Sequence, residues 1–377
     1  MFSYWEHKTW LEDIDFCIIG AGIVGLSAAL HLRRVQPKAR IAIIERGVLP
    51  KGASTKNAGF ACFGSLSELA YDCQKASFDE VLKLVEKRYN GLQLLRTELG
   101  DEALELELLG GYEVFRAEEA SIFENACSIM QDFNAALEEF IPGRPVYSDV
   151  SHQISKLGFK HINSMLFNRA EGQIHTGKMM DSLLRKVQAS QSVLLFGLPV
   201  IGLDDSGKSV SIKTESGTLR ASKVIITTNG FASTFLPELD LFPARAQVLV
   251  TSEIENLRFK GAFHLDEGYY YFRNVGNRVL LGGGRNLDFE GETTPSHEVT
   301  APIQEKLEQL LHEVIIPDEK YTIDYRWAGT MGLGSVKNPI VKQISPSVFC
   351  GVRMGGMGVA LGSATGREVA ELALQNQ

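Results

Sequence analysis

The chain has 377 residues, of which 44% are hydrophobic and 22% are charged, and its formal net charge is −8. This length leaves room for two domains, and an acidic balance without a Lys/Arg block argues against a nucleic-acid partner. The five cysteines show no metal-ligand spacing, so we expect reduced thiols and no metal site. Charged opening residues and the lack of a long apolar run predict a cytoplasmic protein with at most peripheral membrane contact.

The first strong pattern is a glycine fingerprint within residues 15–30. An apolar run, residues 16–19, precedes Gly20, Gly22 and Gly25 and a helix-forming segment. Such a run is typical of a parallel strand that is buried on both faces. Glycines at this spacing permit a tight turn, a close approach of the backbone to a pyrophosphate, and close packing of helix on strand. The stretch therefore predicts a dinucleotide site at the N-terminus of a helix.

A second buried-strand pattern, residues 40–44, ends at Glu45, twenty residues after Gly25. A carboxylate at this spacing accepts hydrogen bonds from a ribose 2′-hydroxyl and repels a 2′-phosphate, which disfavours NADP. The alternative is a surface glutamate that merely ends a strand. The loop that follows, residues 46–60, is rich in small and polar residues that either contact a cofactor or cap the next helix.

The middle of the chain alternates helical and β patterns. Helical spacing occurs in residues 77–99, 118–140, 177–189 and 303–315, and strand patterns occur in residues 110–116, 192–196, 199–203, 210–214, 223–230, 247–251, 268–273 and 278–282. The strand that ends at Thr228, Asn229 and Gly230 has the form of another nucleotide-domain strand. The later strands, with a hairpin turn at residues 274–277, predict a substrate domain inserted between pieces of the nucleotide domain.

Glycines concentrate a second time near the end of the chain, in residues 351–366, before a C-terminal helical segment. Two glycine clusters at opposite ends of one chain are hard to explain by an NAD site alone. A flavin dinucleotide has two ends to hold, so we expect one cluster at the pyrophosphate and the other at the isoalloxazine ring.

These motifs together resemble the D-amino-acid oxidase superfamily of FAD-dependent oxidoreductases, which includes glycine oxidase, sarcosine oxidase and D-amino-acid dehydrogenase. The resemblance covers nearly the whole chain. It is carried by residues 18–30, by Glu45-Arg46, by residues 52–54 and 57–59, by residues 224–230, by residues 327–329 and 338–340, and by residues 355–366.

The resemblance implies a mixed α/β and α+β fold. A discontinuous Rossmann-like FAD-binding domain would comprise residues 1–88, 155–236 and 323–377, and an inserted antiparallel-sheet substrate domain would comprise residues 89–154 and 237–322. It further implies FAD contacts at Gly20, Ala21, Gly22, Ile23, Val24, Gly25, Glu45, Arg46, Ala53, Ser54, Thr55, Asn57, Ala58, Gly59, Val200, Thr228, Asn229, Gly230, Gly329, Arg353, Gly355, Gly356, Met357, Gly358 and Val359.

The chain departs from this family where its relatives bind a substrate carboxylate. Met331 stands where amine-oxidising relatives carry an arginine, and Gly356 or Ala360 aligns with basic residues. Replacement anchors are Arg285, Arg326, Arg353 and Lys56, with Arg285 as the first choice. Strand alternation is expected to turn one or two of Tyr269, Tyr270 and Tyr271 toward the flavin, and Tyr270 is taken as the candidate.

The resulting hypothesis is an FAD-dependent enzyme that oxidises the CH–NH bond of an amino acid or small amine by hydride transfer to flavin N5. Arg285, Tyr270 and Arg326 are the candidate substrate-side residues, and oxygen or an electron carrier would be the acceptor. Three alternatives stay open. They are an FAD-dependent dehydrogenase of a 2-hydroxy acid, an NAD-dependent dehydrogenase, and a non-catalytic flavin-binding protein.

Overall fold

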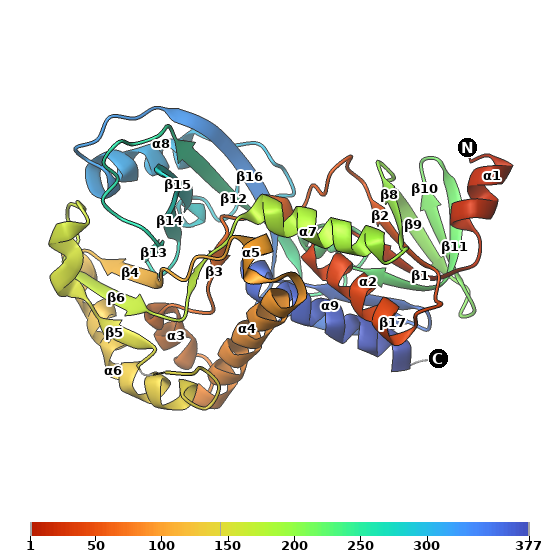
Figure 1. The fold of residues 1–377 in the computed structure, drawn as a ribbon, viewed down its shortest axis with the longest axis horizontal. Helices are drawn as coiled ribbons and strands as arrows, with labels where there is room; N and C mark the ends of the chain where they lie inside the picture. The colour runs from red at the N-terminus through yellow and green to blue at the C-terminus, as the bar shows by residue number, and fades with distance from the viewer. Residues whose placement is uncertain (1, 144, 376–377) are drawn as a thin grey trace.

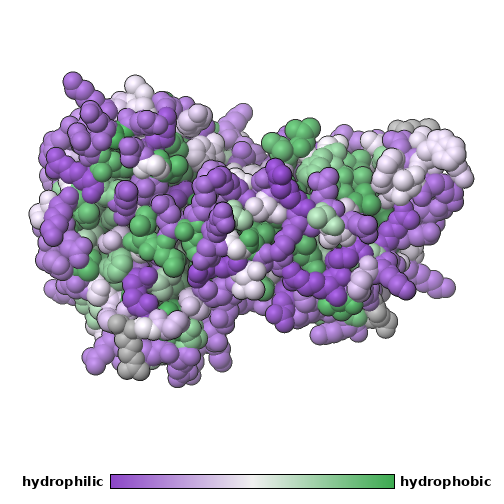
Figure 2. Space-filling view, viewed as in Figure 1, coloured by the Kyte–Doolittle hydropathy of each residue, from purple (hydrophilic) through white to green (hydrophobic). Residues whose placement is uncertain are grey.

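The computed structural model describes residues 2–143 and 145–375, which form two lobes, each built on an eight-stranded sheet (Figure 1). The molecule narrows where the lobes join, and polar residues dominate the face shown in Figure 2. No helix in residues 2–143 or 145–375 is both long and apolar enough to cross a membrane.

The sheet of the first lobe, at the right of Figure 1, has the order β17-β18-β11-β1-β2-β8. The neighbours from β18 to β8 run parallel, β17 pairs with β18 antiparallel, and β9 and β10 extend from β11 as an antiparallel meander. The strands are β1 (Ile14–Ile19), β2 (Ile41–Glu45), β8 (Val193–Phe196), β9 (Val200–Asp205), β10 (Val210–Thr214), β11 (Gly217–Ile226), β17 (Ile340–Ser345) and β18 (Val348–Val352).

Strand β1 is buried on both faces, as its apolar run predicts. Phe16 and Ile18 pack in the core beneath helices α2 (Ile23–Val35), α7 (Thr176–Ala189) and α9 (Gly358–Gln375). Cys17 and Ile19 point to the opposite core, which the β9–β10 meander covers. Successive side chains of a strand alternate between faces, so an uninterrupted apolar run fits only a strand covered on both sides.

Two close backbone contacts shape the first nucleotide-binding unit, and the second of them joins the beginning of the chain to its last helix. A Cβ on Gly25 would lie 2.0 Å from the carbonyl oxygen of Gly20, so α2 can approach the turn after β1 only with glycine there. A Cβ on Gly366 would lie 2.4 Å from the carbonyl oxygen of Val24, which sets α9 directly against α2. The last helix of the chain is thus part of the first nucleotide-binding unit.

The sheet of the second lobe has the order β16-β12-β15-β14-β13-β4-β6-β5 and is mostly antiparallel, with β4 and β13 parallel. Its strands are β4 (Gly111–Phe115), β5 (Tyr147–Asp149), β6 (Ser164–Asn168), β12 (Phe242–Thr251), β13 (Ala262–Leu265), β14 (Tyr270–Val275), β15 (Arg278–Gly283) and β16 (Ile323–Leu333). An apolar core that includes Phe263 and Phe272 lies between one face and α8 (Ala301–Leu310), which continues as the π-helical turn η7 (Leu311–Ile315).

Helices α3 (Leu66–Cys73), α4 (Phe78–Leu99) and α6 (Ala120–Leu137) pack beside β4, β5 and β6. Helix α4 begins with a capping box in which the Ser77 hydroxyl and the Glu80 carboxylate each accept from the other's backbone N–H. The shorter elements are α1 (Tyr4–Glu6), η1 (His7–Leu11), η2 (Ala53–Thr55), β3 (Phe60–Ala61), α5 (Asp101–Leu104), η3 (Ala117–Glu119), η4 (Ser151–Lys156), β7 (Gly172–Gln173), η5 (Asn229–Thr234) and η6 (Arg285–Leu287).

The mixed α/β architecture with a Rossmann-like sheet confirms the expected fold class. Sheet membership differs from the expected domain boundaries at two places. Strand β16 pairs along its length with β12 and therefore belongs to the second sheet, as does β6. Both segments were expected in the FAD-binding domain. The difference arises because strand pairing between distant segments leaves no local signal in the sequence. The assignment of whole segments to two functional domains stays a prediction.

Candidate active site

A cavity of about 860 Å³ extends from the Gly20 turn of the first lobe to the second sheet. Residues from both glycine clusters line it, together with the loop after β2 and strands β12, β13, β15 and β16. One end is formed largely by backbone at the carboxyl edge of the parallel sheet, which we call the nucleotide end. The other lies between the second sheet and α3, which we call the substrate end. Ligands of open α/β sheets bind at this edge.

Two helix N-termini meet at the nucleotide end. Gly22, Ile23 and Val24 at the start of α2 line the cavity, as do residues 355–359 at the start of α9. The N–H of Ile23 donates to the Ser54 hydroxyl at 3.0 Å, which fixes η2 over this turn. Helix N-termini present unpaired N–H groups and a positive dipole end, so this region suits anionic groups.

The Glu45 carboxylate is buried and lies in the wall of the nucleotide end. Its Oε2 accepts from the N–H of Ala21 at 3.2 Å, and its Oε1 accepts from the N–H of Gly47 at 3.0 Å. Arg46 beside it lies over the ring of Phe231 at 3.8 Å and also lines the cavity. These contacts hold an acceptor carboxylate in a fixed orientation, as recognition of ribose hydroxyls requires.

Most of the sequence-predicted cofactor residues line this cavity. They are Gly20, Gly22, Ile23, Val24, Glu45, Arg46, Ala53, Ser54, Asn57, Ala58, Val200, Thr228, Asn229, Gly329, Gly355, Gly356, Met357, Gly358 and Val359. Asn229 also connects the two clusters, because its Oδ1 accepts from the backbone N–H groups of Arg353 and Met354 at 3.1 Å each.

Six predicted cofactor residues do not line the cavity, namely Ala21, Gly25, Thr55, Gly59, Gly230 and Arg353. The Thr55 hydroxyl donates to the carbonyl of Pro50 at 2.7 Å. The Arg353 guanidinium turns away and donates to the carbonyl of Asn338 and to Asp240, each at 2.9 Å or less. The Arg353 side chain is therefore wrong as a replacement carboxylate anchor, because its guanidinium holds the chain between β16 and β17, and a cofactor contact of Arg353 stays a prediction.

The residues present fit a flavin dinucleotide. The cavity is elongated, its nucleotide end offers two helix N-termini and a fixed carboxylate, and the buried hydroxyl of Thr228 in its wall has no hydrogen-bond partner among the described residues. A buried polar atom without a partner costs free energy unless a ligand or water satisfies it. An adenosine at Glu45, a pyrophosphate at α2 and a flavin ring at α9 would satisfy these groups.

Of the residues predicted to contact the substrate, only some lie at the substrate end of the cavity. Arg285 lines the cavity, whereas Tyr270 is 1% exposed in the apolar core on the opposite face of the sheet. The prediction for Tyr270 is wrong, because strand alternation puts its neighbours Tyr269 and Tyr271 on the cavity side. Arg326 is also wrong, since its guanidinium donates to Gln304 at 2.7 Å and to Glu308 at 2.8 Å, away from the cavity.

Arg285 is a cation without an acidic partner in the described part of the chain. Its Nε is buried and has no hydrogen-bond partner, and its guanidinium carbon lies 4.9 Å from the ring centroid of Phe289. Burial lowers the pKa of Arg285 from its ordinary value. By contrast, Arg245 in the same lobe forms an ion pair with Glu292 at 2.6 Å, so of these two arginines it is Arg285 that keeps donors for a ligand at the substrate end.

Four further residues at the substrate end escaped sequence reasoning: Phe60, Glu68, His264 and Lys337. No motif marks any of them, because they come from a short strand, a helix, a different sheet and a loop. Phe60 and Tyr271 contact edge to face with ring centroids 5.6 Å apart, and Phe60 and His264 do so at 5.2 Å. Gly282 leaves room for the Tyr271 ring, which would otherwise lie 2.6 Å from a Cβ.

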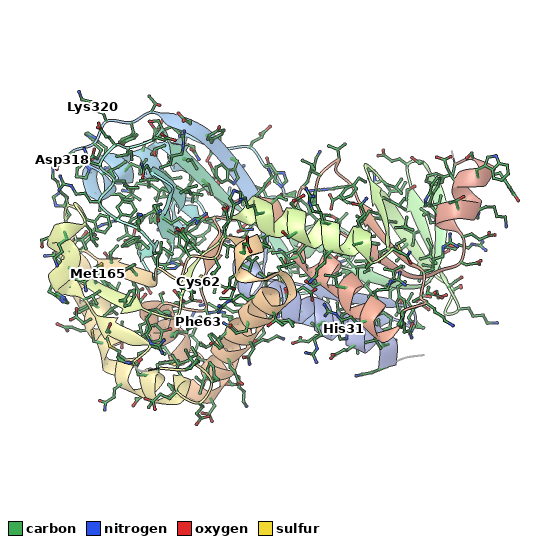
Figure 3. The ribbon with its side chains drawn as sticks, viewed as in Figure 1. His31, Cys62, Phe63, Met165, Asp318 and Lys320 are labelled. Atoms are coloured by element: carbon green, nitrogen blue, oxygen red, sulfur yellow. The ribbon has the colours of Figure 1, made fainter. Side chains whose placement is uncertain are left out.

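Two buried carboxyl groups support the turn at residues 62–67, which leads into α3 and carries Cys62 and Phe63 (Figure 3). Glu171 accepts from the N–H groups of Phe63 at 2.8 Å and Gly64 at 3.1 Å, and Glu113 accepts from the N–H of Ser67 at 3.1 Å. Burial raises the pKa of Glu171 to about 8 and that of Glu113 to about 7. Both acids are therefore largely protonated in slightly acidic solution.

Comparison with known proteins agrees with this geometry. The model of the family described as FAD dependent oxidoreductase (DAO) matches residues 15–372, and the chain belongs to this family. It is a flavoenzyme whose cofactor is FAD, and the expectation of an oxidoreductase is confirmed.

Particular relatives span nearly the whole chain. The protein named Probable oxidoreductase OrdL of Rhizobium meliloti is 26% identical over 96% of this chain and 83% of its own length. Gamma-glutamylputrescine oxidoreductase of Escherichia coli is 20% identical over 98% of this chain and 86% of its own length.

Solved structures share the fold. L-proline dehydrogenase from P. horikoshii has a TM-score of 0.75 at 16% identity, covering 97% of this chain and 95% of that one. Glycine oxidase from Geobacillus kaustophilus has a TM-score of 0.75 at 17% identity, covering 96% and 95%.

Proposed function

We propose that this enzyme oxidises the CH–NH bond of an amino acid or small amine, and that Arg285 binds the carboxylate of an amino-acid substrate. The observation that carries this proposal is the unpaired Arg285 guanidinium at the substrate end of the cavity. A half-buried cation with free donors is stabilised by a bidentate carboxylate, and partial burial strengthens that interaction. Arg285 thereby replaces the arginine that relatives carry at the position of Met331.

The chain's residues contribute binding, orientation and exclusion of water. The starts of α2 and α9 would hold FAD in this cavity, where it would supply the acceptor for a hydride from the carbon next to the substrate nitrogen. Phe60, Tyr271 and Met331 provide apolar walls that keep water from the reacting carbon, and Arg285 fixes one end of the substrate. The starts of α2 and α9 hold negative charge on the cofactor without titrating. The Arg285 N–H donors needed for orientation are thus in place before the substrate binds.

The names of the relatives support the substrate class. Glycine oxidase, L-proline dehydrogenase and gamma-glutamylputrescine oxidoreductase are each named for an amino acid or an amine. Oxygen or an electron carrier is proposed as the acceptor, and reoxidation of the reduced enzyme by air distinguishes the two.

Anaerobic flavin bleaching tests the proposal. FAD-loaded enzyme is mixed with amino acids, amines and matching 2-hydroxy acids, and the flavin absorbance is followed. Bleaching by amines or amino acids is expected, and bleaching by 2-hydroxy acids alone would overturn the choice of bond. For an amino-acid substrate, R285M should raise KM about 100-fold, because a charge-assisted bidentate contact is lost. The matched variant R326M, on the far face of the same sheet, should leave KM within twofold.

A further inference from the structure

The substrate end contains a second unsatisfied charged atom, on Glu68 of α3. Both cations that contact this carboxylate use the same oxygen: Arg88 Nη2 lies 3.2 Å and Lys337 Nζ lies 2.8 Å from Oε1. Oε2 forms no hydrogen bond among the described residues, and the Glu68 side chain, 23% exposed, lines the cavity. Burial would raise the pKa of Glu68, but Arg88 and Lys337 outweigh it and hold the pKa at about 2. The open oxygen therefore belongs to an ionised carboxylate.

Lys337 lies beside Glu68, in the part of the substrate end that we call the Glu68 corner. It has no comparable capacity to bind an anion. Its Nζ is shared between Glu68 and Asp72, each at 2.8 Å. The two carboxylates and the two cations, Arg88 and Lys337, balance in charge. Two of the three N–H donors of Lys337 are thus in use, whereas Oε2 of Glu68 keeps its full acceptor capacity, so this part of the cavity favours an N–H donor over a carboxylate.

The groups around Glu68 suit a protonated nitrogen. The imidazole of His264 has no hydrogen-bond partner among the described residues, and burial lowers its pKa to about 4, so it is uncharged at neutral pH and does not repel a cation. The rings of Phe60 and Tyr271 stand in the same wall. Aromatic faces attract ammonium groups, and the attraction increases when water is excluded.

The Glu68 corner is held rigidly before any ligand binds. Arg88, 1% exposed, donates to the carbonyl of Phe63 at 3.1 Å, and the Tyr147 hydroxyl donates to the carbonyl of Gly64 at 2.7 Å. Together with the contacts from Glu113 and Glu171, these bonds fix the turn from which α3 starts. A fixed carboxylate loses little entropy on binding a ligand, so its contact contributes fully to affinity.

We propose that Glu68, with His264 and the rings of Phe60 and Tyr271, binds a second, non-reacting protonated nitrogen of the substrate. The substrate class is thereby narrowed to amines that carry a further ammonium group beyond the carbon–nitrogen bond that is oxidised. This inference rests on the proposed function in taking the cavity as the amine-binding site, but it does not depend on Arg285.

The test compares ligands of one chain length on holoenzyme whose FAD has been reduced beforehand with dithionite under anaerobic conditions, so that no ligand is oxidised during the titration. Calorimetric titration gives the Kd of cadaverine, a five-carbon diamine, of n-pentylamine, which lacks the second ammonium, and of valerate, which offers only a carboxylate. Wild-type enzyme should bind cadaverine at least about tenfold more tightly than n-pentylamine, as expected for a charge-assisted hydrogen bond. E68Q should bring that ratio below about two while leaving valerate unchanged.

Two matched variants act as controls. E267Q removes another carboxylate from the same cavity wall, and D72N removes the other partner of Lys337 while leaving the Glu68 charge. Both should keep the cadaverine preference. A preference that survives in E68Q, or that is lost in E267Q instead, overturns the proposal. If E68Q does not retain FAD, the test rests on the wild-type ratio of the n-pentylamine Kd to the cadaverine Kd. A ratio near one overturns the proposal.

Failure of this inference is distinguishable from failure of the proposed function. R285M should abolish valerate binding and leave the cadaverine preference intact. If R285M binds valerate as tightly as the wild type does, while the cadaverine preference is normal, only the assignment of Arg285 as the carboxylate anchor is refuted. Absence of flavin bleaching by every amine would remove the proposed reaction, whatever the Kd values are.

Discussion

The two ends of the cavity are built on different principles. At the nucleotide end, ligand-directed groups are mainly backbone N–H groups at the starts of α2 and α9, and one acid, Glu45, is fixed by backbone donors. At the substrate end, the directed groups are side chains of Arg285, Glu68 and His264, which come from three separate segments. A backbone site requires small residues at fixed spacing and so leaves a local motif, whereas a side-chain site requires only that distant segments meet.

The largest effect is expected from a side chain at the nucleotide end. G25V would place a branched side chain where even a Cβ lies 2.0 Å from the Gly20 carbonyl oxygen, so α2 must move from β1. We expect the variant to purify without FAD, as measured by the ratio of flavin to protein absorbance. In the control G202A the added Cβ meets only the flexible Lys213 side chain, at 3.6 Å and away from the cavity lining, so FAD content should stay normal. Full flavin occupancy in G25V would contradict the role given to this contact.

The second effect is a change in pH dependence at the support of the substrate end. Glu171 has a folded-state pKa of about 8, above its ordinary value of 4.5. Between these values the folded state holds a proton that the unfolded state has lost, so stability falls as pH rises, by about 1.4 kcal/mol per pH unit for each such group. E171Q removes this dependence, and its stability curve should be flatter than that of the wild type up to pH 8.

Equilibrium urea unfolding at several pH values measures this slope. E113Q is the matched control, because the pKa of Glu113 is about 7 and its contribution should end one pH unit earlier. Parallel curves for the wild type and E171Q would show that Glu171 titrates normally.

Part of the fold and part of the candidate site could be predicted from the sequence alone. The glycine motifs and doubly buried strands predicted the first sheet, and a helix expected over residues 77–99 is present as Phe78–Leu99. The pairing of β16 with β12 was missed, because pairing depends on residues about eighty positions away. Tyr270 was chosen over Tyr271 because alternation defines two faces without telling which one meets the cofactor. Glu68 was missed because its role depends on which oxygen its neighbours leave open.

A smaller effect is expected at Glu45. E45Q keeps the shape of the side chain but replaces one acceptor oxygen and removes the charge, so ribose hydroxyls would be bound less strongly. We expect FAD to bind about tenfold more weakly to reconstituted apoprotein, as followed by quenching of flavin fluorescence. An unchanged Kd would indicate that the fixed carboxylate only organises the loop at Gly47.

The smallest effect is expected at Tyr270. Y270F should leave kcat/KM within twofold, since this ring lies in the core behind the sheet. Steady-state assays with whichever amine bleaches the flavin measure it. Y271A, one residue further along the strand, should lower kcat/KM at least about tenfold by opening the cavity wall to water. Equal losses in both variants would contradict the assigned faces of β14.

The contact between α9 and α2 has a consequence for biosynthesis. The start of helix α9 lines the nucleotide end of the cavity, and its Gly366 seats it on α2, which is synthesised long before it. While translation continues, a nascent chain holds only half of the dinucleotide cradle. Coenzyme capture must therefore wait until α9 has left the ribosome.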